Sequence, residues 1–414
     1  MRSTRQHDCP EKRQPQGKSL SRRELLGSSS AALLAMGMSA APLIQTQASA
    51  FSRGIPSNSD IDAFVNGLLP QSATPGLSLA VVREGLVAYA QGYGCANLAT
   101  GRPVTPQTVF QSASLTKPVF AYAVLKLCER GQLRLDTPLN AYAPASLICR
   151  DPSAQRITTR HALTHTSGLP NWTNGKRPMD LQFAPGESFS YSSEGYLYLQ
   201  DAVERVAGRT LRDLMDQAVL GPAGMRDSSM IWMPAHESTA ATGYEWDLTP
   251  VEFVSKPTEA GAASTLHTTA RDYAAFLCAL LQPPGPDAYR LDYVSERMML
   301  SPQVRLNASG LAWGLGWGLL LSDEGDRFWH WGDSRGFMSY VMGSRREQSA
   351  VVIFTNGRHG LRLCHKVAEY VMGGQDPVYR WIYEVFYEGK LREWPAPAPA
   401  PAPAPAKRRR KGSR

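Results

Sequence analysis

A serine and a lysine three residues apart could together form a nucleophile and its base. Ser114 and Lys117 lie in the segment SASLTKPVF, residues 112–120, before an apolar run. A serine hydroxyl is a poor nucleophile until a base accepts its proton, and a lysine can do so only if burial lowers its pKa. On a helix this spacing places both side chains on one face, with the serine near backbone N–H groups. Because Ser-x-x-Lys also occurs by chance, the surrounding sequence must decide.

The elements around this pair alternate between strand and helix patterns. Residues 76–101 predict a β-hairpin, and apolar residues from Val119 onward recur at helical spacing until Gly131. Further helices are predicted at 208–225, 269–281 and 360–373, the last followed by YRWIYEVFY at 379–387. Strands are predicted at 311–321, 327–332, 337–343 and 349–355.

This order predicts an α/β domain whose N-terminal and C-terminal strands pair in one sheet. Residues 135–270 mix short helices with loops rich in Pro, Gly and Ser, so they predict a helical insertion. We therefore expect one enzyme-sized domain at 51–390, with separate segments at 1–50 and 391–414.

The positive charge of the chain is concentrated at its two ends. The sequence has 44 Lys and Arg against 36 Asp and Glu. Residues 1–50 hold seven basic and three acidic residues, and residues 407–414 hold six basic residues, which leaves 31 basic and 33 acidic residues between them. The basic balance is therefore no argument for nucleic-acid binding by the body of the chain.

Residues 1–50 have the pattern of an export signal. Paired arginines in SRRELLG (21–27) precede a weakly apolar run and the small-residue sequence ASA at 48–50. The pair favours the twin-arginine route over an ordinary secretory signal, so we expect a periplasmic or secreted protein. The five cysteines after the signal are widely spaced and predict core thiols rather than disulfides.

The C-terminal segment has a different composition from the rest. A Pro/Ala repeat at 395–406 should extend as polyproline II over roughly 37 Å, before KRRRKGSR at 407–414. Two interpretations stay open: a spacer that holds a cationic patch near an anionic cell-envelope surface, and a disordered solubilising end.

Several motifs, taken in order, resemble the serine β-lactamase and penicillin-binding-protein superfamily. The similarity is to its branch of class C β-lactamases, D-alanyl-D-alanine carboxypeptidases and family VIII esterases, and covers roughly residues 60–375. It rests on the segments 110–144, 157–172 (ITTRHALTHTSGLPNW), 183–211 (containing FSYSSEGY), 221–230, 261–277 and 328–342 (FWHWGDSRGFMSYVM). The resemblance implies the β-lactamase/transpeptidase-like fold, an antiparallel sheet flanked by helices.

The resemblance also implies roles for individual residues. Ser114 would be the acyl-accepting nucleophile, Lys117 its base, and Tyr191 the proton relay of the second motif. His330 and Gly332 match the third motif on the strand that lines the cleft. The backbone N–H groups of Ser114 and Asp333 would form the oxyanion hole.

Two positions depart from the family pattern. Ser193 stands where the second motif usually has Asn, and its shorter hydroxyl puts the positioning of Lys117 or substrate in doubt. His330 stands where dedicated β-lactamases mostly have Lys, so carboxylate capture depends on the protonation of an imidazole. This favours the carboxypeptidase and esterase members.

Competing interpretations exist for four of these features. Tyr191 could be a turn aromatic, His330 a core histidine, and His165 a structural rather than catalytic group. GDSRG at 332–336 matches the nucleophile elbow of α/β-hydrolases with Ser334 as nucleophile, but that elbow needs a helix after the turn, and FMSYVMGS predicts a strand.

The combined prediction is an exported serine hydrolase that forms an acyl-enzyme at Ser114. Its substrate would be a peptide, amide or ester of cell-envelope or small-molecule type, and no cofactor or metal is expected. Two alternatives remain: a β-lactamase proper, and a catalytically silent cell-envelope binding protein on the same fold.

Overall fold

The computed structural model describes residues 55–387, apart from positions 174, 253–254, 283–288, 307, 309 and 324. The predicted export signal at 1–50 and the Pro/Ala and basic segment at 391–414 lie outside these residues. None of the described helices is long and apolar enough to cross a membrane.

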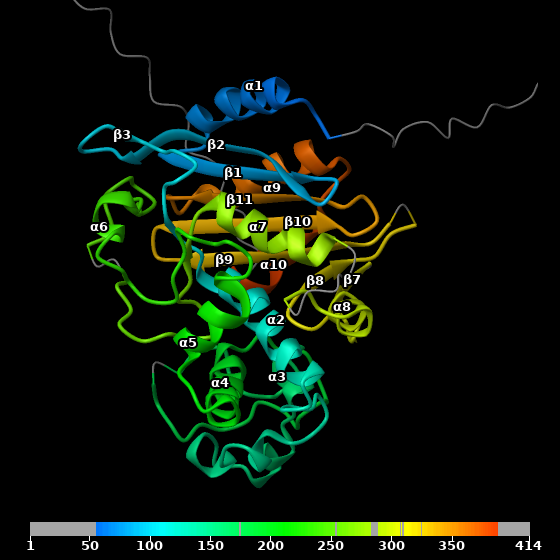
Figure 1. The fold of residues 1–414 in the computed structure, drawn as a ribbon. Helices are drawn as coiled ribbons and strands as arrows, with labels where there is room; N and C mark the ends of the chain where they lie inside the picture. Colours follow the sequence, from blue (N-terminus) through cyan, green and yellow to red (C-terminus); the bar gives the residue numbers. More distant parts are fainter. Residues whose placement is uncertain are drawn as a thin grey trace, which may run out of the picture. The chain divides into compact units, whose positions relative to one another are not determined.

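One antiparallel sheet of nine strands forms the centre of the described fold (Figure 1). In spatial order its strands are β3 (Arg102–Pro103), β2 (Leu86–Asn97), β1 (Gly76–Arg83), β11 (Ser349–Thr355), β10 (Phe337–Ser344), β9 (Arg327–Ser334), β8 (Gly318–Leu320), β7 (Leu311–Trp313) and β6 (Val304–Arg305). A separate pair joins β4 (Phe110–Gln111) to β5 (His267–Thr268). The predicted pairing of N-terminal and C-terminal strands is confirmed, because β1 lies beside β11.

Apolar residues on both faces of the sheet bury two separate cores. Side chains alternate along a strand, so Val351 and Ile353 of β11 face one core while Val352 and Phe354 face the other. The first of these cores is closed by helices α1 (Asn58–Leu68), α9 (Gly360–Met372) and α10 (Pro377–Phe386). The second is closed by α2 (Thr116–Glu129) and α7 (Ala270–Leu281), with α7 in front of the sheet in Figure 1.

The segment between α2 and β5 supplies a helical region beyond the sheet. Its helices are α3 (Thr159–Leu163), α4 (Ser193–Ala207), α5 (Leu211–Met215) and α6 (His236–Thr239), joined by long loops (cyan to green in Figure 1). Helix α4 begins at a Ser192 cap whose hydroxyl accepts from the N–H of Gly195, and it ends where Gly208 adopts the left-handed conformation. The antiparallel sheet flanked by helices confirms the predicted fold class.

Two helices differ from their predicted bounds. Helix α2 begins at Thr116 rather than Val119, so Lys117 lies in its first turn and Ser114 lies on the short 3₁₀ turn Ala113–Leu115 before it. The predicted helix at 208–225 is shorter, because α5 ends at Met215 and a π-helical turn, Asp216–Leu220, follows. Helix α8 (Tyr293–Met299) lies between α7 and β6.

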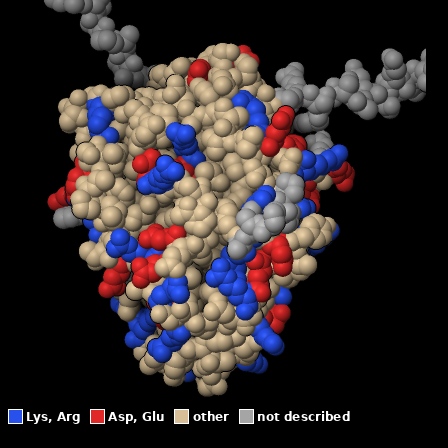
Figure 2. All heavy atoms as spheres, viewed as in Figure 1, with Lys and Arg blue, Asp and Glu red and all other residues tan. Residues whose placement is uncertain are grey.

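Charged side chains are mixed on the face drawn in Figure 2, where lysines and arginines are interspersed with acidic residues. This distribution agrees with the near balance of 31 basic and 33 acidic residues between the two ends of the chain. Cys95, Cys128, Cys149, Cys278 and Cys364 are all unpaired in the described residues.

Candidate active site

The nucleophile candidate lies on a tight turn at the start of helix α2. Ser114 is the middle residue of the 3₁₀ turn Ala113–Leu115. Ala113 has φ of 50°, a left-handed conformation that is uncommon for a residue with a Cβ. The strained residue directs the chain from β4 into the turn and holds the Ser114 side chain at the end of the helix, where the first N–H groups lack intrahelical acceptors.

Lys117 is fully buried beside this serine. Its Nζ donates to Ser114 Oγ at 3.2 Å, to Ser193 Oγ at 3.1 Å and to the carbonyl of Ala263 at 2.9 Å. No carboxylate is among these partners, so nothing offsets the desolvation of the ammonium group. Burial therefore lowers the pKa of Lys117 to about 7. A large fraction of Lys117 is then neutral near pH 7 and can accept the serine proton.

Ser193 is part of a hydrogen-bond chain that reaches Lys117. Its hydroxyl donates to Asn171 Oδ1 at 2.9 Å and accepts from Lys117. The N–H of Ser193 also donates to the same amide oxygen, at 3.2 Å. The family usually has an asparagine at position 193, and here Asn171 supplies a side-chain amide that reaches Lys117 through the Ser193 hydroxyl. Sequence reasoning did not identify Asn171.

Tyr191 lies against Lys117 and is almost completely buried. The face of its ring is 4.9 Å from Lys117 Nζ. Its hydroxyl meets no partner at hydrogen-bond geometry. Desolvation raises the pKa of Tyr191, and the interaction with the Ser114 hydroxyl opposes that rise only in part. Tyr191 therefore rests as a neutral phenol that faces the nucleophile, while Lys117 is the better resting base.

His165 packs behind Tyr191 rather than at the nucleophile. The two rings stack with centroids 4.1 Å apart, and His165 Nδ1 accepts from the N–H of Ser192 at 3.0 Å. The carbonyl of His165 accepts from the N–H of Ser190. Burial keeps the pKa of His165 well below its ordinary value. These contacts hold the segment 190–192, which supports the structural interpretation of this histidine.

Strand β9 approaches the nucleophile turn where Gly332 lies. A Cβ on Gly332 would come within 2.3 Å of the carbonyl oxygen of Ser112 and 2.2 Å of Ser339 Oγ. Ser339 Oγ also donates to that carbonyl, at 3.1 Å. Only glycine permits this approach, which brings the backbone of β9 beside the turn that carries Ser114.

The backbone of β9 near Asp333 has one uncovered edge. Strand β8 pairs with β9 only at 327–329, so 330–334 lack a partner on that side. Along an antiparallel pair of strands, facing residues alternate: in one pair the backbone N–H and C=O groups bond each other, and in the next pair these groups point away from the partner strand. Met338, opposite Asp333, directs its carbonyl to Thr355 of β11. The N–H of Asp333 therefore points to the uncovered edge, as an oxyanion donor requires.

His330 is completely buried, which supports its interpretation as a core histidine. Its Nδ1 lies 2.8 Å from the carbonyl of Trp331, and its ring packs among Tyr191, Trp313 and Trp317. Burial, with a smaller effect from the Lys117 charge, lowers the pKa of His330 to about 3. The imidazole is thus neutral near pH 7, because the alternation of β9 turns this side chain into the core.

The rival nucleophile elbow is excluded by the local structure. Ser334 ends β9, a two-residue turn follows, and β10 returns antiparallel from Phe337. No helix follows the serine, and Ser334 Oγ donates to Gln111 Oε1 at 3.0 Å. GDSRG is therefore a β-hairpin turn.

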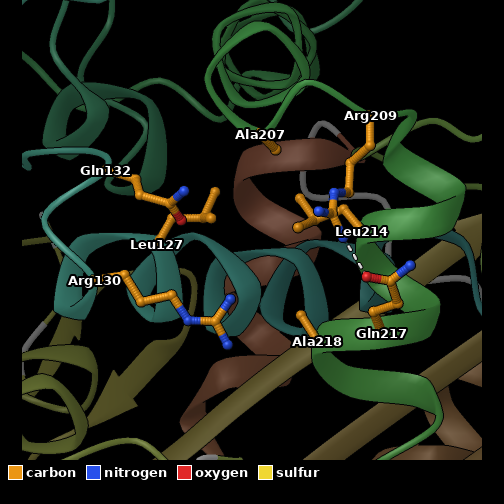
Figure 3. Close-up of a pocket in the computed structure, with 8 residues that line it drawn as sticks. All are labelled: Leu127, Arg130, Gln132, Ala207, Arg209, Leu214, Gln217 and Ala218. Carbon is orange, nitrogen blue, oxygen red and sulfur yellow. Dashed lines mark hydrogen bonds between the residues drawn. The ribbon is translucent and has the colours of Figure 1, made fainter.

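Two cavities lie away from these residues. One, of about 190 Å³, lies at the far end of α2, and Figure 3 shows its lining by Arg130, Arg209 and Gln217 over apolar side chains. Another, of about 300 Å³, is lined by residues that include Arg226 and His236. Neither lining includes Ser114, Lys117 or Tyr191. Among the described residues, no group of three or more His, Cys, Asp or Glu side chains could hold a metal ion.

Comparisons with known proteins identify the family of this chain. The model of the Beta-lactamase family matches residues 61–371. Esterase EstB of Burkholderia gladioli is 34% identical over 200 residues, which are 41% of this chain and 51% of the esterase, so the chain spans about half of that relative. Protein flp of Staphylococcus aureus is 25% identical over 72% of this chain and 63% of its own length. The crystal structure of a D-alanine carboxypeptidase AmpC from Burkholderia cenocepacia superposes with a TM-score of 0.64 at 22% identity, over 77% of this chain and 99% of that one.

The chain therefore belongs to the Beta-lactamase family, a family of serine hydrolases.

Proposed function

We propose that this protein is a serine hydrolase that acylates and deacylates at Ser114. The observation that carries the proposal is the 3.2 Å hydrogen bond between Lys117 Nζ and the Ser114 hydroxyl. Lys117 is fully buried, and none of its hydrogen-bond partners is a carboxylate. A lysine whose pKa is lowered to about 7 has little structural use, but it is what a serine nucleophile needs from a base.

The geometry supports a sequence of proton transfers. Neutral Lys117 accepts the proton of Ser114 as Oγ attacks the substrate carbonyl. The N–H groups of Ser114 and Asp333 stabilise the oxyanion, and Tyr191 relays the proton to the leaving group. A water molecule then attacks the acyl carbon and gives up a proton, which the same groups pass to the departing Ser114 Oγ, so that the free acid leaves and the serine hydroxyl is restored.

The substrate we propose is a peptide, amide or ester whose recognition does not depend on a charged His330. This histidine is neutral, and the nearby Arg358 is already paired with Asp333 at 2.6 Å. The described site thus offers no unpaired cation at the third motif to a substrate carboxylate. An esterase or amidase activity on substrates without a carboxylate at this position fits these charges better than the activity of a dedicated β-lactamase or of a carboxypeptidase, whose substrates carry one.

Export is also a proposal, carried by the paired arginines and the ASA sequence of residues 1–50. The cationic end at 407–414 would then meet an anionic cell-envelope surface.

Covalent labelling tests the catalytic proposal. A fluorophosphonate should add one adduct to the wild type, on the peptide that contains Ser114, and none to Ser114→Ala. Ser334→Ala is the matched control, because this serine lies on β9 and bonds Gln111. It should label like the wild type. A wild type that is not labelled would favour the alternative of a catalytically silent binding protein. An adduct on Ser334 would favour the α/β-hydrolase nucleophile elbow instead. Turnover of a chromogenic cephalosporin at rates equal to those for esters would favour a β-lactamase.

A further inference from the structure

The side chain of Asp333 is held from the face of the sheet opposite the nucleophile. Tyr387, directly after helix α10, donates its hydroxyl to Asp333 Oδ2. Arg358, in the loop between β11 and α9, donates to Asp333 Oδ1 at 2.6 Å and to the carbonyl of Ser334 at 3.4 Å. Both carboxylate oxygens are therefore bonded, from two separate parts of the chain.

This arrangement follows from the alternation of β9. Gly332 faces the turn of Ser114, so the next side chain, Asp333, points to the opposite face, where α9 and α10 pack. Phe386 strengthens the contact of α10 with the site, because its ring lies 5.5 Å from that of Tyr191 and 4.8 Å from that of Trp331. The end of α10 therefore touches both the relay tyrosine and the strand beside the nucleophile.

The peptide of Asp333 needs such support because the sheet holds it from one side only. Strand β8 does not reach residues 330–334, so the N–H of Asp333 has no strand partner that fixes its direction. An oxyanion donor must be directed before the reaction in order to lower the barrier. A carboxylate fixed at both oxygens restricts rotation of the residue that carries this N–H.

The same contacts address an electrostatic problem. Asp333 places a carboxylate on the residue whose N–H would stabilise a developing negative charge, and like charges at short distance repel. The guanidinium of Arg358 pairs with that carboxylate, and both side chains are mostly buried, at 21% and 28% exposed. The pair therefore presents little net charge to the oxyanion.

We propose that Tyr387 and Arg358 are positioning residues that clamp the Asp333 carboxylate and thereby fix and electrostatically prepare its N–H as an oxyanion donor. The C-terminal helix α10 is then part of the catalytic apparatus rather than only a cover for the sheet. This inference rests on the proposed acyl-enzyme function.

Two substitutions test the clamp through different atoms. Tyr387→Phe removes one hydrogen bond to Asp333 and should lower kcat for an activated ester about 10-fold at unchanged KM, less than the ~10²–10³-fold loss expected for a missing donor. Arg358→Met also leaves the carboxylate charge unpaired, so it should lower kcat more. In that background Asp333→Asn should restore part of kcat, because the repelling charge is gone. A purely structural role would not predict this rescue.

The matched control is Tyr379→Phe. Tyr379 also lies on α10, but its ring packs against His365 and Tyr383 rather than holding Asp333. Its kcat should equal that of the wild type. Circular dichroism checks that each variant is folded. If Tyr387→Phe does not fold, the kcat of Arg358→Met and its recovery with Asp333→Asn test the clamp instead.

The clamp and the underlying function fail in distinguishable ways. A wild type that is not labelled at Ser114 would refute the proposed function. If the wild type labels and turns over but Tyr387→Phe and Arg358→Met match Tyr379→Phe, only the clamp is wrong. A rise in KM at constant kcat would overturn it too, because Tyr387 would then act in substrate binding.

Discussion

Burial of Lys117 should make the stability of this protein depend on pH in a way that one substitution removes. Lys117 has an ordinary pKa of 10.5 when unfolded and a pKa of about 7 in the folded protein. Between these values the unfolded chain binds a proton that the folded protein does not, so stability rises with pH. The two pKa values differ by about 3.5, and each pH unit corresponds to about 1.4 kcal/mol. Burial of Lys117 therefore lowers the free energy of unfolding by about 5 kcal/mol below pH 7 and does not lower it above pH 10.5.

Lys117→Met keeps an unbranched side chain that is one atom shorter and removes the titrating group. From pH 7.5 to pH 9.5 the wild type should therefore gain about 2.5 kcal/mol in unfolding free energy relative to this variant, by integration of the proton-binding difference. Urea unfolding, followed by the fluorescence of the nine tryptophans, measures the unfolding free energy at each pH. All other titrating groups are common to both proteins and cancel in the difference.

The control is Lys126→Met, which removes a lysine from the same helix whose Nζ pairs with Glu129 at 2.6 Å. This variant should not reproduce the pH dependence of Lys117→Met. A wild-type advantage that stays constant within about 0.5 kcal/mol from pH 7.5 to 9.5 would refute the reasoning, because Lys117 would then titrate near its ordinary pKa. In the same wild type, kcat/KM for an activated ester should rise as pH increases through about 7.

Four further predictions concern the second motif, the third motif and export. Tyr191→Phe should lower turnover of an activated ester by about 10²–10⁴-fold, the usual contribution of an acid–base group, and a loss under tenfold would favour a turn aromatic. Gly332→Ala should lower kcat by about 10²-fold, because the added Cβ pushes β9 from the nucleophile turn; wild-type kcat would contradict the close approach. Because the pKa of His330 is about 3, the kcat/KM ratio of a carboxylate substrate to its methyl ester should be equal at pH 6 and pH 8; a ratio that is higher at pH 6 would contradict a neutral His330. Finally, Arg22→Lys with Arg23→Lys should block export by the twin-arginine route, measured by cell fractionation; normal export would indicate an ordinary secretory signal.

The contact between Ser114 and Lys117, the proposed nucleophile and base, was predictable because it is local. Ser114 and Lys117 are three residues apart, and the apolar residues that bury the lysine follow directly in the sequence. The sheet was predictable as well, since β9, β10 and β11 are runs of alternating or continuous apolar residues at strand length.

The supporting contacts were not predictable because they join distant segments. Asn171 reaches Ser193 across 22 positions, and Tyr387 reaches Asp333 across 54. No period or motif in one sequence identifies such pairs. One signal did exist for Asn171. Ser193 replaces the asparagine that the family usually has there, which indicated that another side chain could supply an amide near Lys117.

The expected role of His330 shows a different limit. Resemblance to a Lys-containing motif suggested a group that offers charge, whereas the sequence FWHWG itself places His330 between two tryptophans. The strand alternation and the neighbouring Trp313 and Trp317 bury the ring, and burial determines its protonation. The motif indicated the strand on which His330 lies, but the protonation state of the imidazole follows from its burial.

The pairing of β1 with β11 also has a consequence for synthesis. Leu77 lies opposite Thr355, so the centre of the sheet cannot form until almost the whole described chain has left the ribosome. At about 5–20 residues per second, the β1 edge waits roughly 15 to 55 s for its partner. Closing such a loop costs about 4 kcal/mol more than closing a short hairpin, and folds rich in long-range pairs form slowly. Nascent chains that stop before β11 should therefore show no reactive Ser114, and fluorophosphonate labelling during synthesis would report the moment at which the sheet closes.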